Sequence, residues 1–466
     1  MIAAIGVQML GAQGRPLDWT NFAGDAQRTG WRKQDLRITR ENVKDLQLVL
    51  KRKFDNAGAG PHSLTPPVVI GNLISYKGFK ELGFVTGAPD SMWSIDVDLD
   101  RMFWQKKFPG TPKASGACAA VATAVPSLTP PRNFAARPRS RSDVPLEGIL
   151  AKDGAYGHQP AFAVSSDGKL HVLNTSTGED LVKPVPFLPA GSKASNLAIV
   201  DGFIYTTTTA ACGGTAGVWA IDLSTIDPDK PGSLPKVWSR KGGVGGLAFG
   251  TDNTVYVQTD AGDLLALDPK DLHVTNTHAG LGATATPVVF QDKDRDVVVA
   301  SGARGQLTLL DSKLTVMAQT PPLVTSGRGV WGGLATWADP AGARWILAPV
   351  WGAPKAGVVA FELEEKDGKP ALTQRWMKEM SAPEIPVIAS GIVFALSAGE
   401  YASDDAQGAG HAVLFGLDGT TGKELYSTAN QVAAPANLNG VTVANGRVYF
   451  ATTDNTLYAF GIFLER

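Results

Sequence analysis

The sequence is poor in several features, and each scarcity excludes a class of protein. It holds 2 cysteines in 466 residues, too few for a disulfide framework or a cysteine-rich metal domain. No apolar run is long enough to span a bilayer as a helix. Neither sign of charge prevails, since 43 Lys and Arg face 44 Asp and Glu. This balance gives no reason to expect nucleic acid or an anionic membrane as a partner.

Long helical periodicity is also missing, whereas turn-forming residues are abundant. The chain contains 52 Gly and 30 Pro, and its apolar residues fall in short runs that alternate with polar ones. Such runs, separated by turn signals, are typical of β-strands joined by tight turns. We therefore expect an all-β protein.

A short phrase recurs along the chain: alternating apolar residues, then an Asp or a related residue, then a turn. It ends at Asp96, Asn174, Asp222, Asp268, Asp311, Glu362, Asp418 and Gly461. Most repeats are about 43 to 56 residues apart, which is the spacing of four-stranded propeller blades. The repeat predicts a single β-propeller with eight blades, each a four-stranded antiparallel sheet.

The last repeat, residues 441–463, has its inner strands but lacks an outer one. The stretch 46–54 near the start supplies an unassigned strand pattern. We expect the two chain ends to share one blade, because this closes the ring and pairs edges that would otherwise be exposed. The propeller then covers residues 18–466, with a Pro- and Arg-rich inserted loop at 110–156 between the first two blades.

The Asp residues that end the phrase are expected to be structural. A carboxylate at this point can accept backbone N–H bonds from the turn that follows. The aromatic residues that end the outer strands are expected to pack between neighbouring blades. They are Trp104, Trp238, Trp376 and Tyr426.

Residues 1–17 are predicted to be a signal-peptide remnant or a disordered N-terminus, since the stretch from Met1 to Gly14 is apolar and ends in small residues but lacks a basic start. Cys118 and Cys212 lie in Gly- and Ala-rich stretches and could form one long-range disulfide, or could be unrelated thiols. A disulfide would fit export. A periplasmic or secreted location, in a bacterial envelope, is the resulting expectation.

The loops that lead into the innermost strands would line the axial funnel of the propeller. They hold His62, His158, Trp331, Glu384 and Asn437, and Trp351 is expected at a strand end nearby. Trp331, flanked by glycines, could offer a flat face to a planar ligand or could pack between blades. The His and Glu residues could ligate a metal or move a proton, or could be ordinary loop residues. No metal-ligand spacing, nucleophile elbow or phosphate-binding loop is present, so no metal site is predicted.

Several motifs carry a family resemblance. They read Asp18-Trp19-Thr20-Asn21-Phe22-Ala23-Gly24-Asp25, Arg28-Thr29-Gly30-Trp31, Glu41-Asn42-Val43-Lys44-Asp45-Leu46 and Leu417-Asp418-Gly419-Thr420-Thr421-Gly422-Lys423-Glu424-Leu425. They resemble the opening and the repeat motif of pyrroloquinoline-quinone (PQQ)-repeat propellers, the quinoprotein alcohol dehydrogenase-like family. The family includes quinone-dependent alcohol dehydrogenases and a subunit of the outer-membrane assembly machine, so fold alone does not imply function.

In the dehydrogenases of that family, a divalent cation such as calcium binds the quinone together with a Glu and an Asn, and an Asp acts as base. The resemblance aligns the base segment with residues 280–287, where both Asp positions are Gly. It places the Glu at Ala211 and the Asn near Ala261, beside Asp260. The cationic quinone contact falls at Ala303, beside Arg304. A register slip of one would be needed to recruit Asp260 or Arg304, and such a slip reverses the face of a strand residue.

Three functions follow as hypotheses. The first is an exported, non-catalytic binding or scaffold protein with a small-molecule or envelope-protein partner, because other residues stand at the family's catalytic positions. No cofactor is expected in that case. The second is a divergent PQQ-dependent alcohol or sugar dehydrogenase, an oxidoreductase acting on CH–OH groups, with a rearranged site around Asp260, Arg304, Trp331 and Glu384. The third is a scaffold within an envelope complex. A closed propeller is expected to be a monomer.

Overall fold

The computed structural model describes residues 18–462, except 34, 36, 58–59, 76–77, 111–121, 125–159, 210–213, 228–233, 243–244, 283–284 and 404–405. Residues 1–17, His158, Cys118 and Cys212 therefore lie outside the described residues. The expectations for a signal remnant, for a role of His158 and for a disulfide remain predictions.

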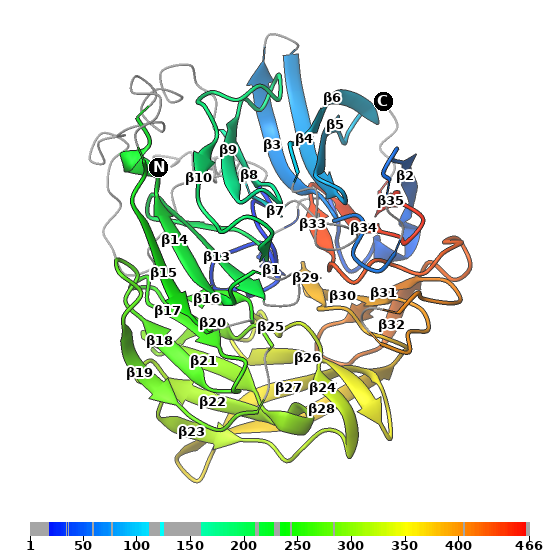
Figure 1. The fold of residues 1–466 in the computed structure, drawn as a ribbon. Helices are drawn as coiled ribbons and strands as arrows, with labels where there is room; N and C mark the ends of the chain where they lie inside the picture. The colour runs from blue at the N-terminus through cyan, green and yellow to red at the C-terminus, as the bar shows by residue number, and fades with distance from the viewer. Residues whose placement is uncertain are drawn as a thin grey trace, which may run out of the picture.

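Eight separate sheets stand around a common centre, as Figure 1 shows. We number the blades in chain order. Blade 1 contains β3 (Val68–Ser75), β4 (Gly78–Gly87), β5 (Ser91–Asp96) and β6 (Arg101–Lys107), and blade 2 contains β7 (Ala122–Ala124), β8 (Ala161–Val164), β9 (Lys169–Leu173) and β10 (Val185–Pro186). Blade 3 contains β11 (Lys193–Ala194), β12 (Ala198–Val200), β13 (Phe203–Thr209), β14 (Gly217–Asp222) and β15 (Val237–Lys241). Blade 4 contains β16 (Leu247–Phe249), β17 (Val255–Gln258), β18 (Leu264–Leu267) and β19 (Val274–His278).

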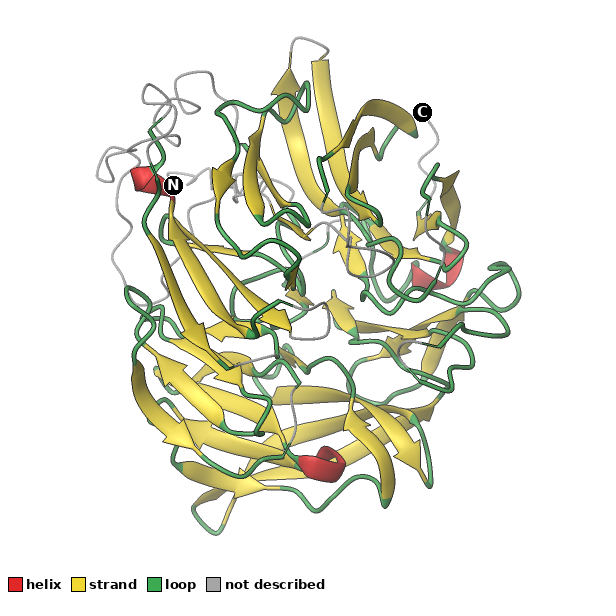
Figure 2. Cartoon of the chain, viewed as in Figure 1, coloured by secondary structure: helices red, strands yellow, loops and turns green. Residues whose placement is uncertain are grey.

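Blade 5 contains β20 (Val288–Asp292), β21 (Arg295–Ser301), β22 (Leu307–Asp311) and β23 (Val316–Gln319), and blade 6 contains β24 (Ser326–Val330), β25 (Ala335–Ala338), β26 (Arg344–Ala353), β27 (Gly357–Lys366) and β28 (Lys369–Glu379). Blade 7 contains β29 (Val387–Ala389), β30 (Ile392–Ser397), β31 (Val413–Asp418) and β32 (Glu424–Ser427), and β1 (Trp31–Arg32) pairs with its first strand. Blade 8 contains β33 (Thr442–Ala444), β34 (Arg447–Ala451), β35 (Thr456–Gly461) and β2 (Gln47–Lys53). Short 3-10 turns occur at Val43–Asp45, Leu223–Thr225 and Ala303–Gly305. Strands dominate the regular structure (Figure 2), and the predicted all-β, eight-bladed fold is confirmed.

Blade 8 is built from both ends of the chain. β2 pairs antiparallel with β35, with Gln47 opposite Gly461 and Lys53 opposite Thr456. The predicted closure is therefore confirmed, and the predicted strand at 46–54 is the outer strand of this blade. Closure removes an unpaired edge at the junction of the ring.

Part of the predicted inserted loop is a strand instead. Ala122–Ala124, within 110–156, form β7 and pair antiparallel with β8, with Ala122 opposite Val164. The Pro- and Arg-rich composition around this short Ala-rich segment hid its strand pattern. Residues 111–121 and 125–156 of this stretch lie outside the described residues.

The Asp residues that end the repeated phrase are turn residues, as predicted. In each turn, one carboxylate oxygen accepts a backbone N–H bond from the residue two positions on. The donors are Asp98 to Asp96, Ser224 to Asp222, Lys270 to Asp268, Lys313 to Asp311 and Thr420 to Asp418. These bonds fix the turns between the third and fourth strands of the blades.

Two outer-strand tryptophans pack onto the turn of the following blade. The indole N–H of Trp376, in blade 6, donates to the carbonyl of Gly419 in blade 7 over 3.1 Å. Trp104, in blade 1, donates in the same way to Thr175 in blade 2 over 2.9 Å. A methyl group on Gly422 would lie 2.7 Å from the Trp376 ring, so the turn needs a glycine there. The predicted packing between blades is confirmed at these positions.

Most core side chains lie on the faces where neighbouring blades meet. The cluster around Trp376, for example, joins Leu347 and Val358 of blade 6 to Ile388, Val393 and Leu417 of blade 7. Burial of these apolar faces supplies the main driving force for assembly of the ring. In the described part of the chain, no helix has the length and apolar character needed to cross a membrane.

Candidate functional site

Residues 18–32, here called the N-terminal plug, lie in the centre of the ring, where β1 appears in Figure 1. Backbone hydrogen bonds join the plug to the first strands of blades 1, 4, 5, 6 and 7. The pairs are Trp19 with Val69, Ala26 with Phe249, Gln27 with Val289, Thr29 with Thr336 and Gly30 with Ile388. Five sheets that are distant in sequence are therefore fastened to a single segment near the axis.

A buried arginine holds the plug in place. Arg28 is 2% exposed, and its guanidinium donates to the carbonyls of Leu247 and Phe22, each over 2.6 Å. Burial lowers the pKa of Arg28 to about 10, and the nearby Asp25 carboxylate opposes this shift. Burial in turn raises the pKa of Asp25, although hydrogen bonds from Thr29 favour its ionised form. The plug is therefore anchored by a buried guanidinium that donates to two backbone carbonyls, with the Asp25 carboxylate nearby.

A cavity of about 230 Å³ lies against the plug. Its described lining comes from the plug and from the segments that lead into the first strands of seven blades. Among the lining residues are Asn21, Phe22, Thr65, Thr86, Ser195, Asn196, Gly246, Thr286, Trp331, Glu384, Asn439 and Thr442. Glu384 is the only ionisable residue in this described lining, which is otherwise made of apolar, amide and hydroxyl groups.

Glu384 is 2% exposed and has two hydrogen-bond donors. The indole N–H of Trp331 donates to Oε1 over 3.0 Å, and the backbone N–H of Gly440 donates to Oε2 over 2.8 Å. Burial raises the pKa of Glu384 to about 7, and the two hydrogen bonds only partly offset this effect. None of the ion pairs within 4.0 Å among the described residues includes this carboxylate.

Three neighbouring aromatic rings lie beside this carboxylate, and two of them are stacked. Trp331 stacks on Trp351 with ring centroids 4.6 Å apart, and Tyr401 lies 6.5 Å beyond Trp351. The indole N–H of Trp351 donates to the carbonyl of Pro383 over 2.8 Å, which ties the stack to the residue before Glu384. The exposed Arg328 lies over the Trp331 ring at 5.4 Å. Trp351 therefore already occupies one face of Trp331, which the sequence suggested as a flat ligand platform.

The structure brings four of the predicted site residues into this region. Trp331 and Glu384 line the cavity, and Trp351 lies behind Trp331. His62 Nδ1 lies 3.3 Å from Oδ1 of the lining residue Asn439.

Asn437 has a structural role in the described contacts. It is 1% exposed, and its Nδ2 donates to the carbonyl of Thr452 over 2.8 Å. Its Oδ1 accepts from the backbone N–H of Ser63 over 3.3 Å. These bonds join blade 8 to the segment that leads into blade 1, and Asn437 is not among the described lining residues.

Asp260 and Arg304 are exposed and are also not among the described lining residues. Asp260 follows β17, and Arg304 lies in the 3-10 turn between β21 and β22 with a φ of 58°. The backbone carbonyl of Arg304 accepts N–H bonds from Leu323 and Val324. The described contacts thus use the Arg304 backbone to shape a loop.

Comparison with solved structures identifies the architecture. The chain is similar to the quinohemoprotein alcohol dehydrogenase of Comamonas testosteroni, with a TM-score of 0.62 and 14% identity over 96% of this chain and 81% of that one. The fold is that of the quinoprotein alcohol dehydrogenase-like propellers. A europium-containing methanol dehydrogenase matches with a TM-score of 0.62 at 12% identity, covering 96% of this chain and 98% of that one.

The same fold also occurs in a protein that is not named as a dehydrogenase. BamB from Moraxella catarrhalis matches with a TM-score of 0.55 at 14% identity, covering 90% of this chain and 99% of that one. A scan of protein-family models finds no match, and a search of curated proteins finds none either. At these identities the likeness establishes the fold, and the chemistry must be judged from the site.

The described residues do not fit a quinone with its divalent cation. A hard cation such as calcium takes six to eight oxygen ligands, often from several carboxylates. The described lining offers one carboxylate, Glu384, and no second carboxylate to complete such a ligand set. The described lining also has no Lys or Arg to contact an anionic quinone.

A Ser–His–Asp constellation occurs in blade 2, away from the described lining of the cavity. His171 Nδ1 lies 2.9 Å from Oδ1 of Asp180, and its Nε2 lies 3.2 Å from the Ser165 hydroxyl. Ser165 is 1% exposed and His171 is 2% exposed. The Ser165 hydroxyl also donates to Asp167 over 2.6 Å. A nucleophile needs access to its substrate, so burial makes this network a structural link and not a hydrolytic triad.

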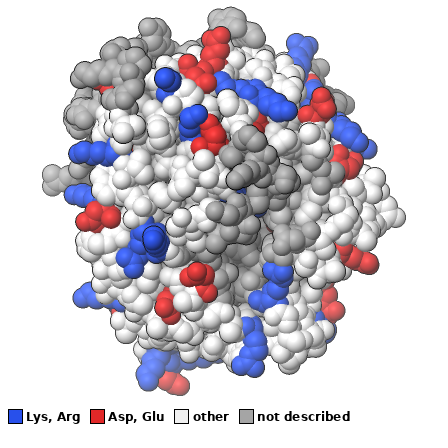
Figure 3. Space-filling model, in the orientation of Figure 1, with Lys and Arg blue, Asp and Glu red and all other residues white. Residues whose placement is uncertain are grey.

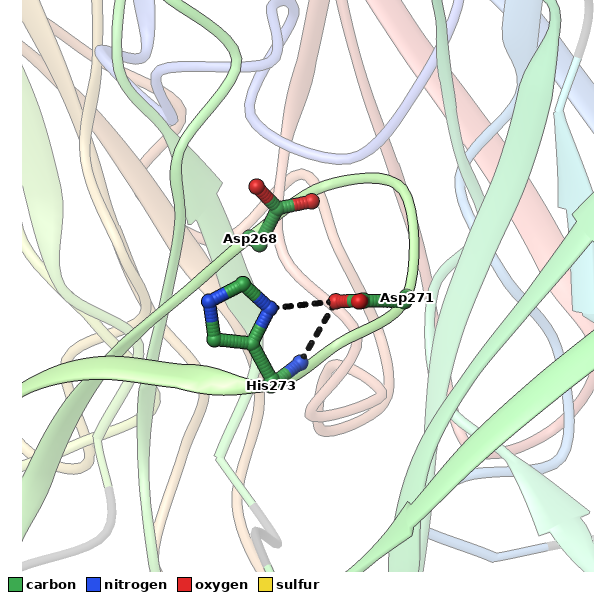
Figure 4. Close-up of side chains that lie close together, drawn as sticks. All are labelled: Asp268, Asp271 and His273. Atoms are coloured by element: carbon green, nitrogen blue, oxygen red, sulfur yellow. Dashed lines mark hydrogen bonds and ion pairs between the residues drawn. The ribbon is translucent and has the colours of Figure 1, made fainter.

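Figure 4 shows a second cluster, at the turn between β18 and β19. Asp268, Asp271 and His273 bring potential ligand atoms within 4.8 Å of one another. Asp271 and His273 are exposed, and Asp268 accepts the N–H of Lys270 over 2.8 Å. The hydrogen bond that the His273 ring donates to the Asp271 carboxylate raises the pKa of His273. These contacts are those of an ordinary turn and give no reason of their own to expect an ion.

Charge on the surface is mixed. On the face drawn in Figure 3, basic and acidic side chains are interspersed around the rim. The outer hairpin of blade 6 illustrates the pattern, since Arg375 pairs with Glu362 and Glu364. This arrangement agrees with the balanced composition and does not resemble the basic stripe of a nucleic-acid site.

Sequence reasoning missed the plug residues of the site, chiefly Asn21, Phe22 and Arg28. They lie in the motif that carried the family resemblance, but they belong to no repeat, so nothing in the periodicity placed them at the axis. A signal was present in Arg28, an arginine among small and polar residues, although its carbonyl acceptor Leu247 is 219 positions away.

Proposed function

We propose that this protein is an exported, non-catalytic binding protein whose axial cavity takes a small molecule. The observation that carries the proposal is the described lining of the cavity, where a single carboxylate stands among neutral groups. The proposal is supported by the Gly residues that replace both Asp of the family's base segment, at Gly280 and Gly282.

The N-terminal plug also supports this proposal, because it limits the volume of the cavity. Its residues Trp19, Asn21, Phe22 and Ala23 form part of the cavity wall, and the remaining volume is about 230 Å³. Pockets for drug-sized ligands typically measure about 300 to 1,000 Å³. A space of this size suits a small metabolite better than a tricyclic quinone together with its substrate.

The competing function is a divergent quinone-dependent oxidoreductase. One observation favours it: Glu384, with a pKa of about 7, could act as a general base toward a hydroxyl group. Such a reaction also needs an electron acceptor, and the described lining offers no ligand set for the quinone and its cation.

A dye-linked dehydrogenase assay tests the proposal. The purified protein is incubated with PQQ and calcium and then supplied with an artificial electron acceptor and a panel of alcohols and sugars. We expect no substrate-dependent dye reduction. Turnover that requires both PQQ and calcium, and that is lost in Glu384→Gln, would replace the binding-protein proposal with the oxidoreductase.

Location and partners belong to the same proposal. Export to the periplasm or the medium is tested by fractionating cells that produce the full-length protein. A monomeric state is tested by light scattering. A stable envelope-protein partner recovered with the native protein would shift the proposal from small-molecule binding toward a scaffold.

A further inference from the structure

The charges around the axial cavity are unbalanced. Glu384 has no cationic partner within 4.0 Å among the described residues, yet it is 2% exposed. An ionised carboxylate in such a place is costly unless a positive charge or several hydrogen bonds compensate it. Trp331 and Gly440 supply one N–H each, so each oxygen retains a lone pair that can face a further group.

Two aromatic residues line the cavity together with this carboxylate. Trp331 donates to it directly, and Phe22 lies beside its other donor, Gly440. A methyl group placed on Gly440 would lie 3.0 Å from Cε2 of the Phe22 ring. Both rings are partly buried and both line the cavity. A cavity that combines a carboxylate with aromatic walls suits an organic ammonium ion, through ion pairing and the cation–π interaction.

We propose that the axial cavity binds a small organic ammonium ion, with Glu384 as its counter-ion and Trp331 and Phe22 as aromatic walls. This inference rests on the proposed binding function and names its ligand class. The amide and hydroxyl groups of Asn21, Asn439 and Thr442 also line the cavity and would suit a hydroxyl group carried by the same ligand. A ligand with a few non-hydrogen atoms, such as choline or ethanolamine, matches a volume of about 230 Å³.

Binding should depend on pH, because the ammonium ion stabilises the ionised form of Glu384. The charged and titratable groups near this carboxylate come from several elements. Arg328 is exposed over Trp331, Tyr401 lies beyond Trp351, His62 contacts Asn439, and Arg28 donates to Phe22 beneath the cavity wall. Of these, His62 is the one whose ordinary pKa falls near neutrality, so it needs its own control.

The test is calorimetric titration of choline into the full-length protein at pH 8. Its uncharged isostere, in which carbon replaces the quaternary nitrogen, serves as the matched ligand. We expect choline to bind and the isostere to bind more weakly by about tenfold or more. Choline affinity should weaken as the pH falls below 7, with protons released on binding as judged from buffers of different ionisation enthalpy. These measurements use the native protein and do not depend on a variant that folds.

Variants then assign the charge. Glu384→Gln should weaken choline binding by about tenfold or more and remove its pH dependence. The exposed Glu400→Gln should retain both the affinity for choline and its pH dependence, and His62→Gln should retain the pH dependence. Equal binding of choline and its isostere, unchanged binding in Glu384→Gln, or absence of binding by both choline and ethanolamine would overturn the inference. PQQ-dependent turnover would instead overturn the proposed function, so the two failures are distinguishable.

Discussion

The indole N–H of Trp331 donates to Oε1 of Glu384 over 3.0 Å, and this hydrogen bond joins the inner ends of blades 6 and 7 beside the axis. It fixes the orientation of a buried carboxylate without neutralising it. The same indole ring stacks on Trp351, so its position is determined from two directions. The site thus combines a rigid aromatic wall with a charge that burial disfavours.

Glu384 should make the stability of the protein fall with rising pH. Its pKa is about 7 in the folded protein against an ordinary value of 4.5, so the folded state holds the proton more tightly between these values. The contribution is complete below about pH 4.5 and is lost as the pH rises through 7, a total of about 3 kcal/mol. In Glu384→Gln this component should disappear.

Unfolding of the two proteins at pH 5 and pH 8 measures the effect. Between pH 5 and pH 8, the difference in unfolding free energy between wild type and Glu384→Gln should shift by about 2.5 kcal/mol in favour of the variant. Glu400→Gln, an exposed change in the loop after β30, provides the control and should follow the wild type. Parallel pH curves for wild type and Glu384→Gln would show that the carboxylate ionises normally.

Arg28→Ala should loosen the N-terminal plug. It removes a buried guanidinium, leaves the carbonyls of Leu247 and Phe22 without these donors, and leaves Asp25 without its nearby positive charge. Hydrogen bonds of a charged group contribute about 1.5 to 3 kcal/mol each, so the loss of these two should cost about 3 to 5 kcal/mol. Urea unfolding should show a loss of this size, whereas Arg295→Ala, at an exposed residue, should change stability by about 0.5 kcal/mol or less. Similar midpoints for both variants would mean that the plug is not held by Arg28.

Trp376 and Gly422 should be energetically coupled. Trp376→Ala leaves a cavity between blades 6 and 7 and should cost about 3 to 5 kcal/mol. Gly422→Ala should be destabilising on its own, because its φ is +70° and the new methyl group would meet the Trp376 ring. In the Trp376→Ala background only the backbone term, about 1 to 2 kcal/mol, should remain. A double-mutant cycle by denaturant unfolding measures this coupling, and strictly additive costs would contradict it.

The Ser165–His171–Asp180 network should be chemically inert and structurally important. A fluorophosphonate that labels active serine hydrolases should leave Ser165 unmodified, because the hydroxyl is buried. Burial opposes ionisation of Asp180, but hydrogen bonds from His171 and Lys106 outweigh it and hold its pKa below the ordinary value. Stability from this carboxylate is therefore present above its ordinary pKa and is lost as the pH falls.

Asp180→Asn checks the structural part of this expectation by thermal unfolding. The variant should melt at a lower temperature than the wild type at pH 7, and the gap should narrow toward pH 3 as the native carboxylate is protonated. Labelling of Ser165 in the folded protein would show that the network is accessible and would reopen a hydrolytic role.

The sequence predicts the architecture well, because its information is periodic. The phrase ending in Asp268 or Asp418 repeats once per blade, and each Asp makes the expected turn bonds. Closure was predictable from a missing strand at one end and a spare strand at the other, now seen as β2 on β35. The strand at Ala122–Ala124 could not be predicted, because three small residues show no alternation of apolar and polar side chains.

The candidate site was only partly predictable. Trp331 and Glu384 could be placed near the axis from their positions before the first strands of blades 6 and 7, but their mutual hydrogen bond joins residues 53 positions apart. Asp260 and Arg304 are candidates only because they lie beside positions that the resemblance aligns with the family's site residues. The structure places both on exposed loops. The contribution of Phe22 depends on the path of the plug, which no local pattern encodes.

Titration calorimetry of the purified protein with PQQ, with and without calcium, tests the account most directly. The single carboxylate and the uncharged remainder of the described lining predict no binding of the quinone under either condition. Tight binding that requires calcium would contradict the account, because it would mean that the axial cavity retains a cation and quinone site.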